Sequence, residues 1–229
     1  MATRICLVGA TGLIGSQLIA QAVARTDVRV VAVARREVPV PKGARMEVLV
    51  ADPSGWADAI AATNAQVMVC ALGTTWRNAG KDEAAFRAVD QDLVLACARA
   101  AKAAGIPHFI LVSSVGANIG SSQLYLRVKG EVEDAIAKLH FKRLDILRPG
   151  LLRGNRTAER RLAERLAILA APLTDLLLHG SRRKYRSISD ETLVEAVFGL
   201  ARERAGGRFV HDHDMLLRAA RRGISHLHG

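Results

Sequence analysis

The most constraining feature of the sequence is a glycine-rich turn between a short apolar run and an amphipathic segment. The run Ile5–Val8 leads into Gly9-Ala10-Thr11-Gly12-Leu13-Ile14-Gly15, and apolar residues then recur at helical spacing up to Val23. Glycine permits a tight turn and close approach of the backbone to a phosphate, whose charge a helix N-terminus stabilises. The turn therefore predicts a dinucleotide site, with a tight turn that binds no ligand as the alternative. Its candidate cofactor contacts are Gly9, Thr11, Gly12, Leu13, Ile14 and Gly15.

Apolar runs of strand length alternate with segments of helical period up to about position 148. The expected strands, all rich in Val, Ile and Leu, are Ile5–Val8, Val28–Ala34, Met46–Val50, Val67–Leu72, Phe109–Ser113 and Leu144–Leu147. Little polar alternation interrupts them, which indicates that helices cover both faces of the sheet. We expect an α/β fold with a doubly wound parallel sheet, a Rossmann-type three-layer sandwich.

The 229 residues are expected to form one domain, residues 1–229, whose pattern loosens after Pro149. There an arginine-rich segment, a broken apolar stretch, a basic turn Ser181–Tyr185 and a helix-like Asp190–Arg204 follow one another. We expect residues 151–229 to form a small substrate-side elaboration at the carboxyl edge of the sheet, where α/β folds bind ligands. Five leucines of the apolar stretch could belong to the core, a substrate wall or a dimer surface, so a homodimer or a protein partner stays open: Leu166, Leu169, Leu173, Leu176 and Leu177.

Composition and charge disfavour several classes of protein. The chain carries 33 Lys+Arg against 22 Asp+Glu, but only 4% of its residues are aromatic and no helix-turn-helix pattern is present, so a nucleic-acid partner is not expected. The apolar stretch Leu166–Leu178 contains Pro172 and Asp175 and is shorter than the roughly 18 apolar residues that cross a bilayer. An integral membrane protein is therefore not expected either.

Cysteine and histidine usage gives two further expectations. Cys6, Cys70 and Cys97 lie in apolar runs without a CxxC pair, and no secretory signal pattern precedes the first strand, so we expect a cytoplasmic protein. The histidine pairs His211/His213 and His226/His228 have no further ligands at metal-site spacing. We expect surface histidines and no metal.

The residues after the second strand bear on the choice of cofactor. Sites that select NAD usually place an acid there to bind the ribose hydroxyls, whereas this strand ends in Arg35-Arg36. A guanidinium can pair with a 2′-phosphate and can lie flat against adenine. NADP(H) is therefore expected in preference to NAD(H), although solvated arginines remain an alternative and Glu37 could compromise the preference.

Two weaker candidates follow the next strands. Asp52 could accept a hydrogen bond from the adenine amino group, or simply cap a helix before Pro53-Ser54. Leu72, Gly73 and Thr74 could border the adenosine ribose.

The strongest catalytic signal is Tyr125-Leu126-Arg127-Val128-Lys129, preceded by Ser113-Ser114 at the end of a strand. On a helix Tyr125 and Lys129 share a face, so the ammonium can lower the phenol pKa from near 10. Tyr125 is then a candidate proton donor, Ser114 a candidate for polarising a carbonyl, and Lys129 a further contact of the nicotinamide ribose. The alternative is an amphipathic helix with a snorkelling lysine.

These motifs together resemble a known family. The glycine turn, Leu72-Gly73-Thr74-Thr75, Val112-Ser113-Ser114-Val115-Gly116-Ala117, Tyr125-Leu126-Arg127-Val128-Lys129-Gly130-Glu131 and Arg148-Pro149-Gly150 are similar to those of the atypical short-chain dehydrogenases/reductases, in particular the Tat-interacting-protein-like oxidoreductases. The resemblance covers roughly residues 4–200. It implies a Rossmann-type fold that binds NADPH, with Ser114, Tyr125 and Lys129 in the catalytic positions.

The same resemblance extends to the loops around the cofactor, with one departure. Pro149, Leu151 and Ser113 correspond to segments that border the cofactor, and Arg153 or Arg156 could meet a phosphate or an acidic substrate. Many relatives carry an asparagine in the fourth helix as part of a proton relay, whereas this chain has Val89-Asp90-Gln91-Asp92. A standard relay is therefore not expected.

The function predicted from these residues is NADPH-dependent reduction of a small carbonyl-bearing substrate, with Tyr125 as proton donor. The alternative is an NADP(H)-binding sensor or scaffold that acts through a protein partner without turnover. Different affinities for oxidised and reduced cofactor would favour the sensor.

Overall fold

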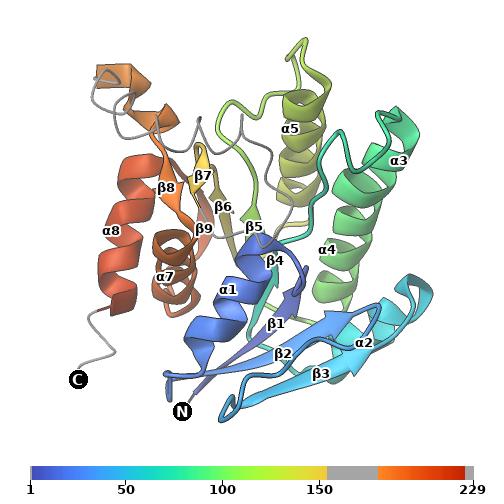
Figure 1. The fold of residues 1–229 in the computed structure, drawn as a ribbon, viewed down its shortest axis with the longest axis vertical. Helices are drawn as coiled ribbons and strands as arrows, with labels where there is room; N and C mark the ends of the chain where they lie inside the picture. Colours follow the sequence, from blue (N-terminus) through green and yellow to red (C-terminus); the bar gives the residue numbers. More distant parts are fainter. Residues whose placement is uncertain (1, 154–179, 225–229) are drawn as a thin grey trace.

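The computed structural model describes residues 2–153 and 180–224, and its centre is a seven-stranded parallel sheet (Figure 1). The strand order is β3-β2-β1-β4-β5-β6-β9, and every neighbouring pair is parallel. The strands are β1 (Thr3–Val8), β2 (Val28–Ala34), β3 (Met46–Val50), β4 (Val67–Cys70), β5 (His108–Val112), β6 (Arg143–Leu147) and β9 (Gly207–His211). The predicted Rossmann-type fold is confirmed.

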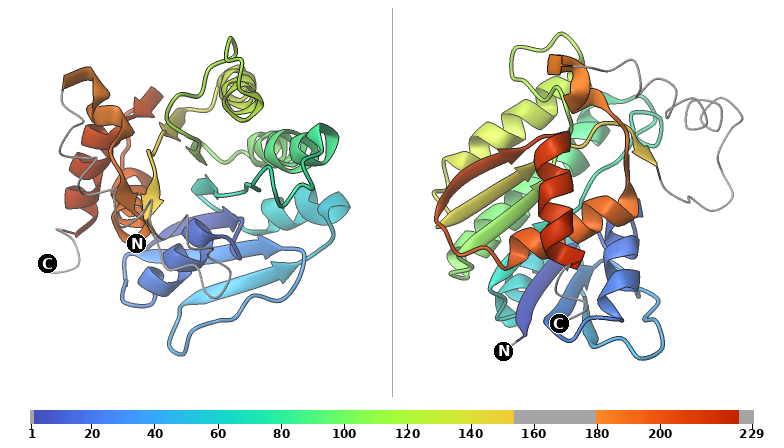
Figure 2. Two further views of the ribbon diagram at one scale, coloured as in Figure 1. Left: turned by 45° about the horizontal axis from the view of Figure 1, so that its top comes forward. Right: turned by 90° about the vertical axis from the view of Figure 1, so that its left-hand side faces the viewer.

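Helices cover both faces of this sheet, as the apolar strands require. One face carries α1 (Leu13–Ala22), α7 (Asp190–Ala201) and α8 (His213–Ile224), and the other carries α2 (Trp56–Ala62), α4 (Val94–Ala103) and α5 (Leu124–Ala137). Alternate residues of each strand enter the two cores, so Ile5 packs on the first face and Cys6 on the second. Figure 2 shows α7 and α8 across the sheet from α4 and α5.

Two helix boundaries show how local sequence sets these elements. The Ser189 hydroxyl accepts a hydrogen bond from the Thr192 amide at 3.1 Å and caps α7, and acidic residues occupy its first turn. At the other end of a helix, Gly105 adopts a φ of 73° after α4, and Pro107 follows it. In both cases residue type explains where the helix begins or ends.

The segment before α4 is not a uniform helix. It begins as α3 (Glu83–Arg87), capped by Asp82, widens into a π-helical turn η2 (Ala88–Leu93), and continues as α4. A π-helical turn inserts an extra residue and often marks a functional position. Here it contains Asp90, whose side chain is fully buried.

The carboxyl end of the chain differs from the expectation of an elaboration confined to the edge of the sheet. Residues 190–224 instead contribute the strand β9 and two helices that cover one face. The pair β7 (Leu152–Arg153) and β8 (Ile188–Ser189), with the short turn η3 (Gly180–Tyr185), follows β6 among the described residues and precedes α7. The apolar stretch Leu166–Leu178, which includes the five leucines named above, lies outside the described residues.

A buried carboxylate fixes β9 against β6. Asp145 accepts hydrogen bonds from Arg143 at 2.6 and 2.9 Å and bonds His108 at 2.6 Å and His211 at 2.7 Å. Burial acts to raise the pKa of Asp145, but these partners outweigh it and hold the pKa well below its usual value. The expectation of surface histidines was wrong for His211 and His213, which are both buried.

Candidate cofactor and catalytic site

The turn between β1 and α1 requires glycine at two positions. Gly9 has a φ of 86°, and a Cβ there would lie 2.5 Å from the carbonyl carbon of Ala71, after β4. A Cβ on Gly15 would collide with the Gly9 carbonyl oxygen. The N-cap residue Gly12 provides no side chain to the first amides of α1, and the first turn has no acid. These amides and the positive end of the helix remain available to an anion.

The other predicted contacts in this turn have distinct positions. Thr11 is exposed, whereas the Ile14 side chain is buried in the core and Leu13 packs against the same cluster. Leu13 and Ile14 therefore face a ligand through their backbone amides rather than their side chains.

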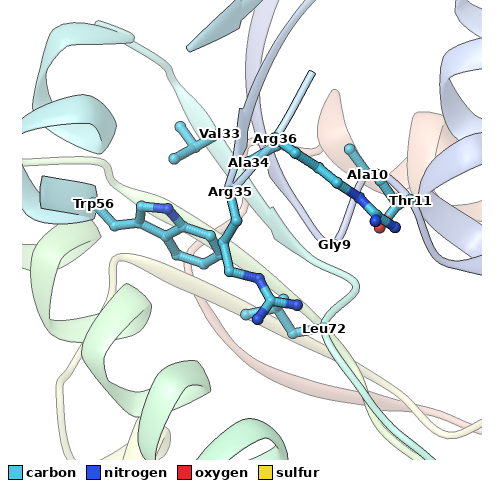
Figure 3. Close-up of a pocket in the computed structure, with 9 residues that line it drawn as sticks. All are labelled: Gly9, Ala10, Thr11, Val33, Ala34, Arg35, Arg36, Trp56 and Leu72. Carbon is cyan, nitrogen blue, oxygen red and sulfur yellow. The ribbon is translucent and has the colours of Figure 1, made fainter. Parts of the chain in front are cut away.

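A cavity of about 360 Å³ opens beside the turn, at the carboxyl ends of β1, β2 and β4. Figure 3 shows Arg36 extending from the end of β2 on the side of Ala10 and Thr11, and Arg35 on the side of Trp56 and Leu72. Neither guanidinium forms an ion pair with the part of the chain that the structure describes. Two such cations beside a helix N-terminus could hold an anionic group.

Trp56 is a pocket residue that the sequence interpretation missed. Trp56 is the first residue of α2, after Gly55, and is buried. Its indole N–H donates a hydrogen bond to the Ala51 carbonyl at 2.9 Å. The bond fixes the ring as one wall of the cavity. An aromatic residue six positions after the end of the third strand was the available signal.

The two weaker candidate segments are separated by the structure. Leu72 lines the cavity, and Gly73 and Thr74 continue toward Lys129, where a Cβ on Gly73 would lie 3.8 Å from Lys129 Nζ. Asp52 is exposed, does not line the cavity, and forms no side-chain cap to the turn Pro53–Gly55. The structure therefore shows no helix cap by Asp52, and it places Asp52 outside the lining of the cavity proposed for adenosine.

Tyr125 and Lys129 lie one turn apart at the start of α5. The Tyr125 ring is 39% exposed and its hydroxyl has no hydrogen-bond partner among the described residues, whereas Lys129 is buried. The Lys129 Nζ atom lies 5.9 Å from the centre of the Tyr125 ring. An accessible phenol above a buried cation is suited to donating a proton.

Asp90 holds the Lys129 ammonium in place. Its Oδ1 atom lies 2.9 Å from Lys129 Nζ, and its Oδ2 accepts the Thr74 amide at 2.6 Å. Burial acts to lower the pKa of Lys129, but the Asp90 carboxylate outweighs it and the pKa is raised. The segment that lacks the relay asparagine thus carries a carboxylate that pairs with Lys129. In the sequence this acid stood out only as a departure from the family pattern.

The two serines after β5 have different surroundings. The Ser113 hydroxyl donates to buried Glu133 at 2.5 Å, and Arg148 pairs with the same carboxylate, so the hydroxyl proton of Ser113 is already engaged within the protein. Ser114 is half-buried and donates only a long bond of 3.3 Å to Val115. It forms no hydrogen bond with Tyr125 or Lys129.

The loop after β6 runs beside these serines. The Pro149 carbonyl accepts the Val115 amide at 2.9 Å, and the Leu151 carbonyl accepts the Ile188 amide at 3.0 Å. Leu151 is 48% exposed and Pro149 is buried, so Leu151 presents the side chain. Arg156 lies outside the described residues, and in residues 2–153 and 180–224 no cluster of acids, histidines and cysteines could hold a metal.

These residues fit a dinucleotide. The uncapped N-terminus of α1 follows β1, and a cavity lined by Arg35 and Arg36 lies beside it. The pair Tyr125 and Lys129 lies at the start of α5. A parallel sheet with such a site defines a nucleotide-binding Rossmann protein. The family described as NAD(P)H-binding matches residues 9–167, and the chain belongs to it.

Similar sequences refine that class. Protein fmp52, mitochondrial, of Emericella nidulans is 35% identical over 171 residues, covering 72% of this chain and 72% of the relative. Rat protein HTATIP2 is 53% identical over 91 residues, but this covers 40% of this chain and 37% of the relative. The resemblance to the atypical short-chain dehydrogenases/reductases is confirmed by these relatives.

Similar structures support the fold. UDP-glucuronic acid 4-epimerase from Bacillus cereus, in complex with NAD, has a TM-score of 0.66 and 15% identity, covering 92% of this chain and 78% of the epimerase. MoeE5 in complex with UDP-glucose and NAD has a TM-score of 0.67 and 17% identity, covering 90% of this chain and 74% of MoeE5.

The expectation of a cytoplasmic protein is contradicted by the comparisons, because several fungal relatives are named mitochondrial. The thiols explain the error. Burial raises the pKa of Cys6 to about 12 and that of Cys70 to about 11, and both are free. Protonated, buried thiols persist in any reducing surroundings and identify no single compartment. None of the described helices is long and apolar enough to cross a membrane.

Proposed function

We propose that the protein is an NADPH-dependent oxidoreductase that reduces a small carbonyl-bearing substrate. The observation that carries the proposal is the exposed Tyr125 hydroxyl above the buried Lys129–Asp90 pair, next to the loop that leads from the arginine-lined cavity. Such an arrangement presents a proton donor at the carboxyl edge of the sheet, where ligands bind.

The roles follow from the contacts. Lys129 is held charged beneath Tyr125 by Asp90, and a neighbouring cation favours the phenolate that remains after proton donation. Ser114 has a weakly engaged hydroxyl on the adjoining loop and would orient the carbonyl oxygen. Bound NADPH would supply the hydride.

The preference for NADPH over NADH rests on Arg35 and Arg36. Neither has an ion-pair partner among the described residues, and both line the cavity beside the glycine turn, so a 2′-phosphate would find available guanidinium donors. The cavity would receive the adenosine part, with Trp56 as its wall and Leu72 at its edge.

The experiment is a pair of fluorescence titrations with NADPH and NADH at fixed salt, followed by an assay of NADPH consumption with the diketone diacetyl. We expect tighter binding of NADPH and carbonyl-dependent consumption. Equal affinity for NADPH and NADH would show that Arg35 and Arg36 do not select between the two cofactors.

The same experiments distinguish the oxidoreductase from the alternative function, an NADP(H)-binding sensor that acts through a protein partner and has no substrate. Tight binding without consumption of NADPH by any aldehyde or ketone, with unequal affinity for NADPH and NADP, would overturn the enzyme in favour of the sensor. The buried ion pair at Lys129 supports the enzyme, because a cation held beneath a partly exposed phenol stabilises the phenolate that remains after proton donation.

A further inference from the structure

Three aromatic rings lie together at the mouth of the catalytic site. The Phe86 ring is fully buried in α3, and both exposed rings pack on it: Trp76 with centroids 6.2 Å apart and Tyr125 with centroids 6.0 Å apart. Trp76 is 41% exposed and Tyr125 is 39% exposed. We refer to Trp76, Phe86 and Tyr125 as the aromatic wall.

The wall is held in place by the loop after β4. Within that loop the Lys81 amide donates to the Trp76 carbonyl at 2.9 Å, the Ala79 amide donates to the Thr75 carbonyl at 3.0 Å, and the Asn78 amide donates to the Thr75 hydroxyl at 3.1 Å. Upstream, Thr74 is fixed by Asp90. A tryptophan carried by a hydrogen-bonded turn offers its ring without a large ordering cost.

The exposure of Trp76 needs an explanation other than core packing. A single exposed apolar side chain is common, but Trp76 shares its buried neighbour with the proton donor of the proposed reaction. The guanidinium nearest to Phe86 in sequence, Arg87, is engaged by Glu83 and Glu131, so it is not available to a charged substrate. The wall therefore offers aromatic surface beside the Tyr125 hydroxyl.

We infer that the substrate carries a flat aromatic ring conjugated to its carbonyl group, and that Trp76 is the residue that selects it. The ring stacks on Trp76 while the carbonyl oxygen meets the Tyr125 hydroxyl. The inference rests on the proposed function. In that reaction the carbonyl carbon gains the hydride of bound NADPH, and the carbonyl oxygen gains the Tyr125 proton. Aromatic pairs prefer offset or edge-to-face contact, which a partly exposed indole permits.

The test uses two matched diketones, diacetyl and acetylbenzoyl, in which one methyl group of diacetyl is replaced by phenyl. For the unaltered protein we expect a higher kcat/KM with acetylbenzoyl. Trp76→Ala should lower kcat/KM for acetylbenzoyl about 5- to 10-fold, mainly through KM, and change that for diacetyl less than about 2-fold. Trp76→Phe should retain most of the preference.

Controls keep the outcomes distinct. Ile224→Ala removes another exposed apolar side chain, at the far end of α8, and should change neither substrate. NADPH affinity and the midpoint of thermal unfolding should be unaltered in Trp76→Ala. Equal losses for both diketones, or no loss for either, would overturn the inference while the proposed function stands. No turnover of either diketone by the unaltered protein, with NADPH bound, would overturn the proposed function and this inference with it.

Discussion

The two halves of the candidate site, the arginine-lined cavity and the region of Tyr125 and Lys129, place their charged groups in opposite ways. Beside the glycine turn, Arg35 and Arg36 have no ion-pair partner among the described residues, so their charge is available to the proposed cofactor. At the catalytic end, Lys129 is paired inside the protein by Asp90, and Glu133 ties Ser113 and Arg148 together. The first half is arranged for binding energy, whereas the second is arranged for fixed geometry.

Replacing Tyr125 should have the largest effect on the comparison. Tyr125→Phe keeps the ring on Phe86 but removes the donated proton, so kcat should fall about 100-fold or more while the NADPH dissociation constant stays within a few-fold. Steady-state kinetics and a fluorescence titration measure the two quantities. Unchanged turnover would remove Tyr125 from the mechanism.

Replacing Asp90 should have the next largest effect and adds a pH test. Asp90→Asn leaves a buried ammonium without its counter-charge, which costs about 3–5 kcal/mol when a buried pair is broken, and should lower the melting temperature. A second readout is specific to positioning. The pKa of Lys129 is now raised, so the pair stabilises the fold below the usual lysine pKa and is lost only as pH rises through the raised value. In the variant, activity should therefore decline at lower pH than in the unaltered protein.

Asp82→Asn is the matched control for that variant, because Asp82 also accepts a backbone amide but at an exposed helix cap. It should leave the alkaline limb of the pH profile where it is. If Asp90→Asn lowers stability without moving that limb, Asp90 is structural and the catalytic half is not tuned through Lys129.

Replacing Arg36 should have the smallest effect and acts on binding alone. Arg36→Ala removes an exposed cation from the cavity, so NADPH should bind about 10-fold more weakly, as for one lost hydrogen bond to a charged group, and NADH should bind as before. Titrations with both cofactors measure this. The control Arg29→Ala removes an arginine of β2, the strand that precedes Arg36; Arg29 already pairs with Glu47, so both affinities should be unaltered. A parallel loss for NADH would show that the arginine does not read the 2′-phosphate.

Much of the fold was readable because its signals are local. The glycine turn and the apolar runs fix the order of strands and helices, and the sheet predicted from them is confirmed. The strand β9 was missed because Gly207–His211 begins with glycine and arginine and carries its polar histidine inward, against Asp145. A polar residue inside the sheet is explained only by its partner, which lies 66 positions away in the chain.

Some residues of the candidate site could be predicted from the sequence and others could not. The glycines and arginines of the cavity could be named because their roles follow from residue type and position after a strand. Trp56 and Asp90 could not, because an aromatic residue in α2 and an acid in a helix have many uses. Their roles appear once folding brings Trp56 beside Arg35 and Asp90 beside Lys129.

The packing of α7 on α1 has a consequence for how the chain is made. α1 leaves the ribosome early, but the helix that covers its Leu18 and Ile14 side begins only at Asp190. Domains begin to fold during synthesis from the N-terminus, so this apolar stripe stays uncovered while about 170 further residues are translated. The packing of the first helix of the chain is thus completed only by residues that are translated last.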